Sequence, residues 1–310
     1  MDRSPPPRHD RLDAFAVGVI TLLCALWGLQ QVAVKVAITG GLPPLLQGGI
    51  RHVVAAALVW MFVRARGGAG AARRLWSIDS AIGPGLVIAA LFALEFIALL
   101  PGLKLTTASH GVLFLYTAPF FTALGVHVFL PAERLDRRQA TGLAIAFTGV
   151  VAAFADGLTA GGGNLVGDLL CLAAGAAWGA TTVVVKASPS LMRAAPERVL
   201  FLQLAGSVPL MAAASLLAGE RLDWQATTPL AWTGLFYQTA VVAFASYLAW
   251  FRLVQVYPAG RLAGFTFLTP LFGILAGATL LGEHASLALL AGLIAIAVGL
   301  RLINSKGRPT

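Results

Sequence analysis

The sequence predicts an all-α integral membrane protein with ten transmembrane helices, arranged as two inverted repeats of five helices each. Three observations support this fold class: an apolar composition, ten long apolar runs, and a motif that occurs twice. Of the 310 residues, 58% are hydrophobic and 11% are charged, and the mean hydropathy is +0.83. Soluble domains are nearer to half apolar and a quarter charged. A bilayer accommodates this excess of apolar residues and a soluble core does not, so the composition argues against a soluble enzyme.

The apolar runs are long and unbroken, and this length predicts helices. A spanning helix needs about 20 predominantly apolar residues, and in lipid it satisfies its backbone polar groups internally. A membrane β-barrel would instead show alternating segments of about ten residues. The predicted spans are 14–37, 45–63, 78–100, 106–130, 139–156, 165–187, 197–218, 230–252, 260–281 and 286–303.

The net charge of +9 has a simple explanation in the orientation of the spans. A basic chain is also typical of nucleic-acid binding, but here the basic residues fall in alternate loops, as they do on the cytoplasmic side of membrane proteins. Both termini are therefore expected in the cytoplasm, which agrees with an even number of spans. The basic residues of the first three cytoplasmic segments are Arg3, Arg8, Arg11, Arg64, Arg66, Arg73, Arg74, Arg134, Arg137 and Arg138.

The chain ends are polar. Residues 1–13 are rich in proline and are expected to form a disordered cytoplasmic tail, as are residues 304–310. The run from Ala14 to Ala37 is too long for a signal peptide and lacks a small-residue cleavage site, so we expect it to be retained as the first span. Cys24 and Cys171 both lie in apolar runs and are expected to be buried as small hydrophobic residues.

A motif at the first span recurs in the sixth. WGLQQVAVK, residues 27–35, returns as WGATTVVVK, residues 178–186, at an offset of 151. Nearly the same offset relates residues through to the end of each half, which defines one repeat at 14–156 and another at 165–303. Five spans are an odd number, so the second repeat enters the membrane from the opposite side. Inverted repeats of this kind are typical of secondary transporters.

The doubled order of motifs resembles the EamA family of the drug/metabolite transporter superfamily. The resemblance rests on the "LWG…K" opening of each half, on "ERLDRRQATGLAIAFTGVV", and on "GEHASLALLAGLIAIAVGL" in the second half. It covers nearly the whole chain after the tail. It implies a ten-helix carrier in the bacterial cytoplasmic (inner) membrane, with two inverted halves around a central cavity. Members export amino acids, as the YddG-type aromatic amino-acid exporters do, and other small metabolites.

Glu95, in the stretch "LEFIALL", is the clearest charge inside a span and a departure from the family, which commonly has aromatic residues there. A carboxylate inside a span costs about 2.5–3.5 kcal/mol to insert. It is a candidate for proton coupling or for binding a substrate ammonium group, and its alternative role is structural, beside a nearby cation or hydrated at the outer surface. Its presence weakens the inference of an aromatic substrate.

The opening helix of each half carries an aromatic and polar stripe that we expect to face the cavity, since Gln and Thr avoid lipid. Ordinary packing and an interfacial aromatic belt are the alternatives. The cavity candidates are Trp27, Gln30, Gln31, Glu95, Phe96, His110, Tyr116, Trp178, Thr181, Thr182 and Tyr247. Lys35 and Lys186, which close the two motifs, are expected to reach water as interfacial anchors.

Matched positions in the fourth and ninth spans are candidates for kinks and gates. Pro119 and Pro270 correspond at the offset of 151, and a proline frees a carbonyl one turn back. His110 and Arg261 also correspond and suggest paired outer and inner gates, with interfacial anchoring as the alternative; His110 is further placed to meet Glu95. The pairs Gly142/Gly149 and Gly292/Gly299 predict close packing of the fifth and tenth spans, within one chain or between two.

The sequence therefore predicts a secondary transporter that exports small metabolites, amino acids first among them. A nucleoside, drug or sugar-derived substrate, a channel, a flippase and an intramembrane enzyme are the alternatives; the last rests only on Gly167-Asp168, without a second mid-span aspartate. No nucleotide-binding or metalloprotease motif occurs. We expect no cofactor, metal or nucleic acid, with proton coupling left open. The expected partners are a small-molecule substrate and the lipid bilayer, and the chain is a monomer or a homodimer.

Overall fold

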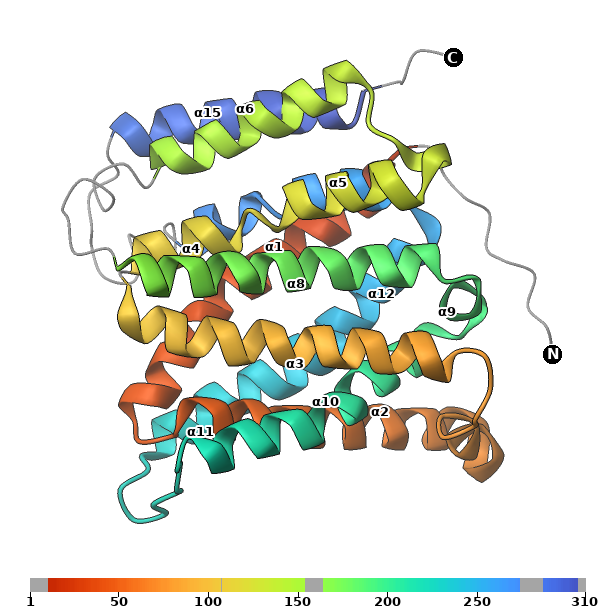
Figure 1. Cartoon of the computed structure of the whole chain (residues 1–310), viewed down its shortest axis with the longest axis vertical. Coiled ribbons are helices and arrows are strands. Elements are labelled where there is room, and N and C mark those ends of the chain that lie inside the picture. The colour runs from red at the N-terminus through yellow and green to blue at the C-terminus, as the bar shows by residue number, and fades with distance from the viewer. Residues whose placement is uncertain (1–10, 107, 154–163, 274–286, 306–310) are drawn as a thin grey trace. The chain divides into compact units, whose positions relative to one another are not determined.

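The computed structural model describes residues 11–106, 108–153, 164–273 and 287–305, and the regular secondary structure of this part of the chain is helical, without strands (Figure 1). The all-α prediction is thereby confirmed. The elements are α1 (Ala14–Thr39), α2 (Pro44–Arg74), α3 (Ile82–Leu105), α4 (Ala108–Leu115), α5 (Ala118–Phe129), η1 (Pro131–Glu133), α6 (Arg137–Ala153), α8 (Leu165–Ala187), α9 (Pro189–Arg193), α10 (Pro196–Leu217), α11 (Pro229–Phe236), η2 (Tyr237–Ser246), α12 (Tyr247–Val256), α13 (Ala259–Phe265) and α15 (Leu287–Ile303).

Within the described residues, seven helices are long and apolar enough to cross a membrane. They fall on predicted spans one to four and six to eight. Helices α6 and α15, each of 17 residues, fall on the fifth and tenth predicted spans. The part of the ninth predicted span beyond residue 273 lies outside the described residues, as do residues 1–10 and the last residues of the fifth span. The total of ten spans and the cytoplasmic termini stay predictions.

Helix α2 extends well past the apolar run that predicted it. The second predicted span ends at residue 63, but α2 continues to Arg74 because its Arg- and Ala-rich continuation favours helix outside the apolar run as well. A kink at Gly68, where φ is 71°, divides the two parts of α2. This positive φ suits glycine, which has no Cβ.

The helices form two compact units, and neither unit is one of the sequence repeats. The first unit contains Gln30–Ile97 and Val184–Gln255, and the second contains Pro7–Leu29, Ala98–Val183 and Val256–Thr310. Each unit therefore takes segments from both halves of the chain. A repeat that shares its helices in this way is not expected to fold as a separate domain.

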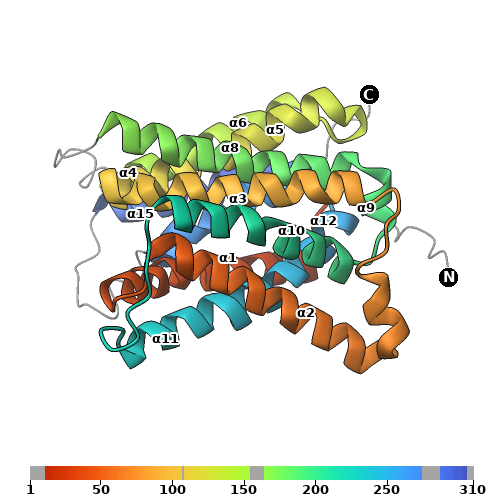
Figure 2. The same cartoon turned by 60° about the horizontal axis from the view of Figure 1, so that its bottom comes forward.

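In the first unit, α2 packs on α10 and on η2 (Figures 1 and 2). The start of α2 is capped by a side chain from a distant segment. Pro43 and Pro44 leave no side-chain cap of their own. Glu220 accepts hydrogen bonds from the backbone N–H groups of Leu45, at 3.0 Å, and Leu46, at 2.7 Å. The carboxylate thus satisfies two donors that a helix N-terminus leaves unpaired.

We expect Glu220→Ala to lower the free energy of unfolding by about 1–3 kcal/mol, because it leaves these two backbone donors without a partner. The control is Glu197→Ala, which removes an ion pair to the exposed side chain of Arg252 and should cost less than about 1 kcal/mol. Thermal or denaturant unfolding of the purified protein in detergent measures both values. Equal losses for the two variants would contradict the capping role.

Asp79, in the segment before α3, is held by Arg198 of α10. Nη1 and Nη2 of Arg198 donate to the two carboxylate oxygens, and Nη2 also donates to the carbonyl oxygen of Ser77 at 2.7 Å. The Arg198 hydrogen bonds, together with the backbone N–H of Ala81, lower the pKa of Asp79 below its ordinary 3.8. A carboxyl group whose pKa is lower in the folded state stabilises the protein at pH values above its unfolded-state pKa. This contribution is lost as the pH falls through the folded-state pKa.

Asp79→Asn should therefore flatten the acid side of the stability–pH profile. The wild-type protein loses this contribution as the pH falls below about 4, whereas the variant has already lost it at every pH. Melting temperatures of both proteins from neutral to acid pH measure the effect. Parallel profiles would show that the Asp79 pair contributes nothing to acid sensitivity.

In the second unit, α6 and α15 lie side by side and cross through two glycine pairs (Figure 1). A Cβ added to Gly142 would lie 2.7 Å from the carbonyl oxygen of Gly299, and one added to Gly149 would lie 2.7 Å from that of Gly292. The residue number rises along α6 from 142 to 149 while that of its partner falls from 299 to 292, so the two helices run antiparallel. The glycine pairs thus pack helices of one chain, which was one of the two predicted alternatives.

The glycine of the repeated WG motif makes equivalent contacts in both halves. A Cβ on Gly28 would lie 2.9 Å from the carbonyl oxygen of Thr269 and 2.8 Å from the backbone nitrogen of Gly273. A Cβ on Gly179 would lie 2.8 Å from the carbonyl oxygen of Ala118 and 3.0 Å from the backbone nitrogen of Thr122. Residues 118 and 122 correspond to 269 and 273 at the offset of 151. The first helix of each repeat therefore packs against the fourth segment of the other repeat.

Candidate functional site

A cluster of charged and aromatic residues lies in the first unit, on α2 and α3. Arg51 is only 1% exposed and its neighbour His52 is fully buried. On α3, Phe92, Glu95 and Phe96 follow helical spacing and therefore share one face, and all three are buried. A buried arginine and a buried glutamate inside apolar helices are costly, and such residues are typical of functional sites in membrane proteins.

The Arg51 guanidinium contacts an aromatic residue from each repeat. Its Nη2 donates a hydrogen bond to the Tyr247 hydroxyl at 2.8 Å. Its central carbon lies 4.7 Å from the ring centroid of Phe96 and 5.6 Å from that of Tyr247. Phe96 and Tyr247 correspond at the offset of 151. Cation–π contacts of this kind partly compensate the loss of water around a buried cation.

Glu95 interacts electrostatically with Arg51, but the two side chains do not form an ion pair. Both side chains are buried, and they lie close enough to interact electrostatically. Among the described residues, no hydrogen bond or ion pair within 4.0 Å joins the two groups. The equivalent position in the second repeat is Ser246, so this charge belongs to one half only. The cluster therefore holds a basic and an acidic side chain that are near each other and not directly paired.

His52 closes the cluster on the side of α10. Its Nδ1 lies 2.9 Å from the hydroxyl of Ser207. Its ring stacks on Phe92 at 4.7 Å between centroids and meets Phe96 edge-on at 5.4 Å. Within the part of the chain that the structure describes, Nε of Arg51 and Nε2 of His52 are buried without a hydrogen-bond partner. Buried polar atoms are normally paired, so these two atoms point to a ligand or to water.

A π-helix leads into this cluster. The chain from Tyr237 to Ser246 forms η2, between α11 and α12. The corresponding segment of the first repeat lies in the regular helix α3. π-Helical segments are rare and frequently occur at functional sites. Tyr247, which accepts the Arg51 hydrogen bond, follows directly after this π-helix.

A second aromatic group lies in the second unit. The Trp27 and Trp178 rings, which are equivalent in the repeat, meet edge to face with centroids 6.1 Å apart. Tyr116 meets Trp178 in the same way at 5.6 Å. Three predicted cavity residues from α1, α8 and the turn after α4 are thus in contact. Edge-to-face aromatic contacts are favourable, and the contact between Trp27 and Trp178 joins equivalent positions of the two repeats.

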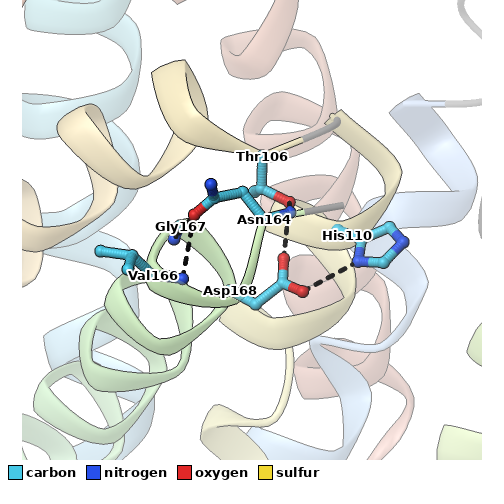
Figure 3. A network of polar contacts seen from close by, with 6 residues as sticks. All are labelled: Thr106, His110, Asn164, Val166, Gly167 and Asp168. Carbon is cyan, nitrogen blue, oxygen red and sulfur yellow. Dashed lines mark hydrogen bonds and ion pairs between the residues drawn. The ribbon is translucent and has the colours of Figure 1, made fainter. Parts of the chain in front are cut away.

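Asp168 joins three segments of the second unit (Figure 3). Its Oδ1 accepts a hydrogen bond from the Thr106 hydroxyl at 2.6 Å, and its Oδ2 lies 3.0 Å from Nδ1 of His110. Asn164 caps α8, since its Oδ1 accepts from the backbone N–H groups of Val166 and Gly167 at 3.0 and 3.1 Å. Asp168 in the first turn also suits the positive end of the helix dipole. The carboxylate that contacts His110 is thus Asp168, where the sequence had suggested Glu95.

The prolines lie just after interruptions in their helices. The chain forms a turn at Tyr116 and Thr117 before Pro119, which sits in the first turn of α5. In the second repeat, α13 ends at Phe265 and a helical segment begins again at residue 268, before Pro270. Proline has no backbone N–H, and the first N–H groups of a helix have no intrahelical acceptor in any case. Proline is therefore well suited to the start of a helix, and a helix that begins just before each proline agrees with the sequence.

The remaining candidates lie in varied surroundings. Arg261 is buried in α13, and Gln30 is buried with its Oε1 unpaired among the described residues. The Thr181 and Thr182 hydroxyls donate to carbonyl oxygens of their own helix, those of Ala177 and Trp178. The side chains of Gln31 and Lys35 lie outside the described residues.

Two residues of importance here were not among the predicted candidates. Arg51 and His52 lie inside the second predicted span, and the rule that selected Glu95, a charge within an apolar run, selects Arg51 as well. Lys186 was predicted to reach water, but it is 4% exposed, and its Nζ donates to the carbonyl oxygen of Val254 at 2.6 Å. That carbonyl lies in the last turn of α12, where helix carbonyls lack intrahelical donors, and this explains the difference.

Several spanning helices, an internal repeat and buried charges together are typical of membrane transport proteins. The EamA-like transporter family matches residues 14–155 and again residues 165–305. The chain belongs to this family, and it is a multi-pass membrane transporter of metabolites, which points away from an enzyme.

Curated relatives cover most of the chain. Proteins named "Probable amino-acid metabolite efflux pump" from Salmonella typhimurium and Escherichia coli are 31% and 30% identical, over 90% and 91% of this chain and 91% and 93% of their own length. A Bacillus subtilis protein named "Uncharacterized transporter YvbV" is 28% identical over 94% of this chain and 92% of its own. A solved structure titled "Crystal structure of protein" has a TM-score of 0.75 at 20% identity, covering 94% of this chain and 96% of that one, and it shows the shared fold alone.

Proposed function

We propose that this protein is a secondary transporter that exports amino acids across the bacterial cytoplasmic membrane by alternating access. The observation that carries the proposal is the buried pair of a basic and an acidic side chain, Arg51 and Glu95, which no hydrogen bond joins. An amino acid carries one carboxylate and one ammonium group, and it therefore complements both charges. The names of two relatives, which speak of amino-acid metabolite efflux, support the same substrate class.

The repeat supports alternating access. Two halves that enter the membrane from opposite sides can expose one site to either face in turn. The helix breaks before Pro119 and Pro270 provide bending points at equivalent positions of the two halves. In this proposal both termini lie in the cytoplasm, and these two segments change shape as the transporter opens.

Efflux from cells tests the direction of transport. Cells that overproduce the protein are loaded with radiolabelled amino acids as peptides, which cytoplasmic peptidases hydrolyse, and the label in the medium is followed over time. We expect faster release than from cells with an equal amount of the Glu95→Gln variant in the membrane. Equal release from both strains and from cells without the protein would contradict export of amino acids.

A further inference from the structure

We propose that the two charged ends of the substrate are recognised separately, with Arg51 binding the α-carboxylate and Glu95 binding the α-ammonium group. The ligand class is the neutral zwitterionic amino acid. This inference rests on the proposed function and adds to it the residues and the charge rule that select the substrate.

Arg51 has the capacity to bind a carboxylate. A guanidinium carries five N–H donors, and a carboxylate accepts two of them in parallel. Among the described residues, the Tyr247 hydroxyl is the hydrogen-bond acceptor for this side chain, and Nε is buried without one. At 1% exposure, a cation with unused donors is costly, since bulk water does not satisfy them. A carboxylate from the substrate would supply both the missing acceptors and the opposite charge.

Glu95 has the complementary capacity. Its side chain is buried and faces the same cluster, but in the described part of the chain it accepts no hydrogen bond that would occupy its oxygens. An ammonium group carries three donors and a positive charge. A ligand with only a carboxylate would satisfy Arg51 and leave Glu95 repelled, and a ligand with only an amine would do the reverse. Both charges are compensated only by a ligand that carries both.

The surroundings of the two charges limit the side chain of the ligand. Phe92, Phe96 and Tyr247 line this part of the first unit, and their rings contact one another or Arg51. His52 contacts the rings of both Phe92 and Phe96 and lies close to Arg51. A third charge, on the side chain of the ligand, would thus enter an aromatic region. Arg51 and Glu95 would already be paired with the α-carboxylate and the α-ammonium group, so neither could compensate it. We therefore expect neutral amino acids to bind better than acidic or basic ones.

The test is a binding experiment on the purified full-length protein in detergent, by thermal shift and by calorimetry. The ligands are the standard L-amino acids, followed by the methyl ester and the N-acetyl derivative of the tightest binder. The wild-type chain should bind the amino acid about 10- to 100-fold more tightly than either derivative, because each derivative leaves one buried charge unpaired. This comparison needs no variant, so it does not depend on how well a variant folds.

The variants assign each charge to its residue. Glu95→Gln should weaken binding of the amino acid about 10- to 100-fold and leave binding of the N-acetyl derivative nearly unchanged. Arg51→Gln should show the same pattern with the methyl ester. Arg252→Gln, which removes an arginine from the same unit at an exposed position, should bind every ligand as the wild type does.

The outcomes separate this inference from the function on which it rests. If the wild-type chain binds no amino acid, the proposed function fails. If it binds amino acids but binds the ester and the N-acetyl derivative equally well, amino-acid transport stands and the two-charge recognition is wrong. If Glu95→Gln weakens all three ligands equally, Glu95 supports the fold and does not contact the ammonium group.

Discussion

Gly28→Val and Gly179→Val should each lower the free energy of unfolding by about 2 kcal/mol or more. At both positions an added Cβ would lie within 3.0 Å of backbone atoms of the partner segment, and backbone cannot move aside as a flexible side chain does. Overpacking of a close contact typically costs about 1–3 kcal/mol. Thermal unfolding of the two purified variants in detergent measures the loss.

Gly18→Val is the matched control for this prediction. Gly18 lies on the same helix as Gly28, and a Cβ added there meets nothing within 4 Å. Its replacement changes helix propensity alone, by a few tenths of a kcal/mol. If Gly28→Val and Gly179→Val melt at the same temperature as Gly18→Val, the first helix of each repeat does not need the close approach that the motif provides.

Arg51→Leu should be the most damaging single change in the first unit, with a loss of about 3–5 kcal/mol in the free energy of unfolding. The substitution removes the guanidinium that interacts with the buried Glu95 side chain, and it removes the 2.8 Å hydrogen bond to the Tyr247 hydroxyl. Glu95→Leu alone should also destabilise the protein, since it removes the acidic side chain that interacts with the buried Arg51 cation.

The double variant Arg51→Leu/Glu95→Leu tests whether the two charges depend on each other. We expect it to be more stable than Arg51→Leu, because no uncompensated charge is left, although it should no longer transport. Unfolding free energies of the four proteins give the coupling between the two residues. A loss in the double variant equal to the sum of the single losses would mean that Arg51 and Glu95 do not interact.

The sequence predicted the helices well for a clear physical reason. An apolar run in lipid must satisfy its own backbone, so run length alone identifies α3 or α8. The repeat could also be recognised from the sequence. Its matched glycines predicted the close packing that is found between Gly142 and Gly299 and between Gly149 and Gly292. Boundaries were less certain where helix continues beyond the bilayer, as in α2.

The candidate site was predicted in part. Glu95, Phe96 and Tyr247 were selected by chemistry, and they meet around Arg51 in the first unit. Arg51 itself was missed because basic residues were assigned to loops when the orientation was inferred. Nothing in the sequence signals that Tyr237–Ser246 forms a π-helix, since a stretch of mostly apolar and small residues also suits an α-helix. Which helix faces meet depends on such rotations, and periodicity does not fix them.

The most direct measurement of the central claim, a carrier that binds a zwitterionic amino acid at Arg51 and Glu95, is counterflow in proteoliposomes. Vesicles containing the purified protein are loaded with unlabelled amino acid and diluted into a trace of the same amino acid in radiolabelled form. We expect a transient accumulation of label that Glu95→Gln abolishes and Arg252→Gln preserves. Absence of accumulation with every standard L-amino acid, from wild-type protein shown to be folded in the vesicles, would contradict it.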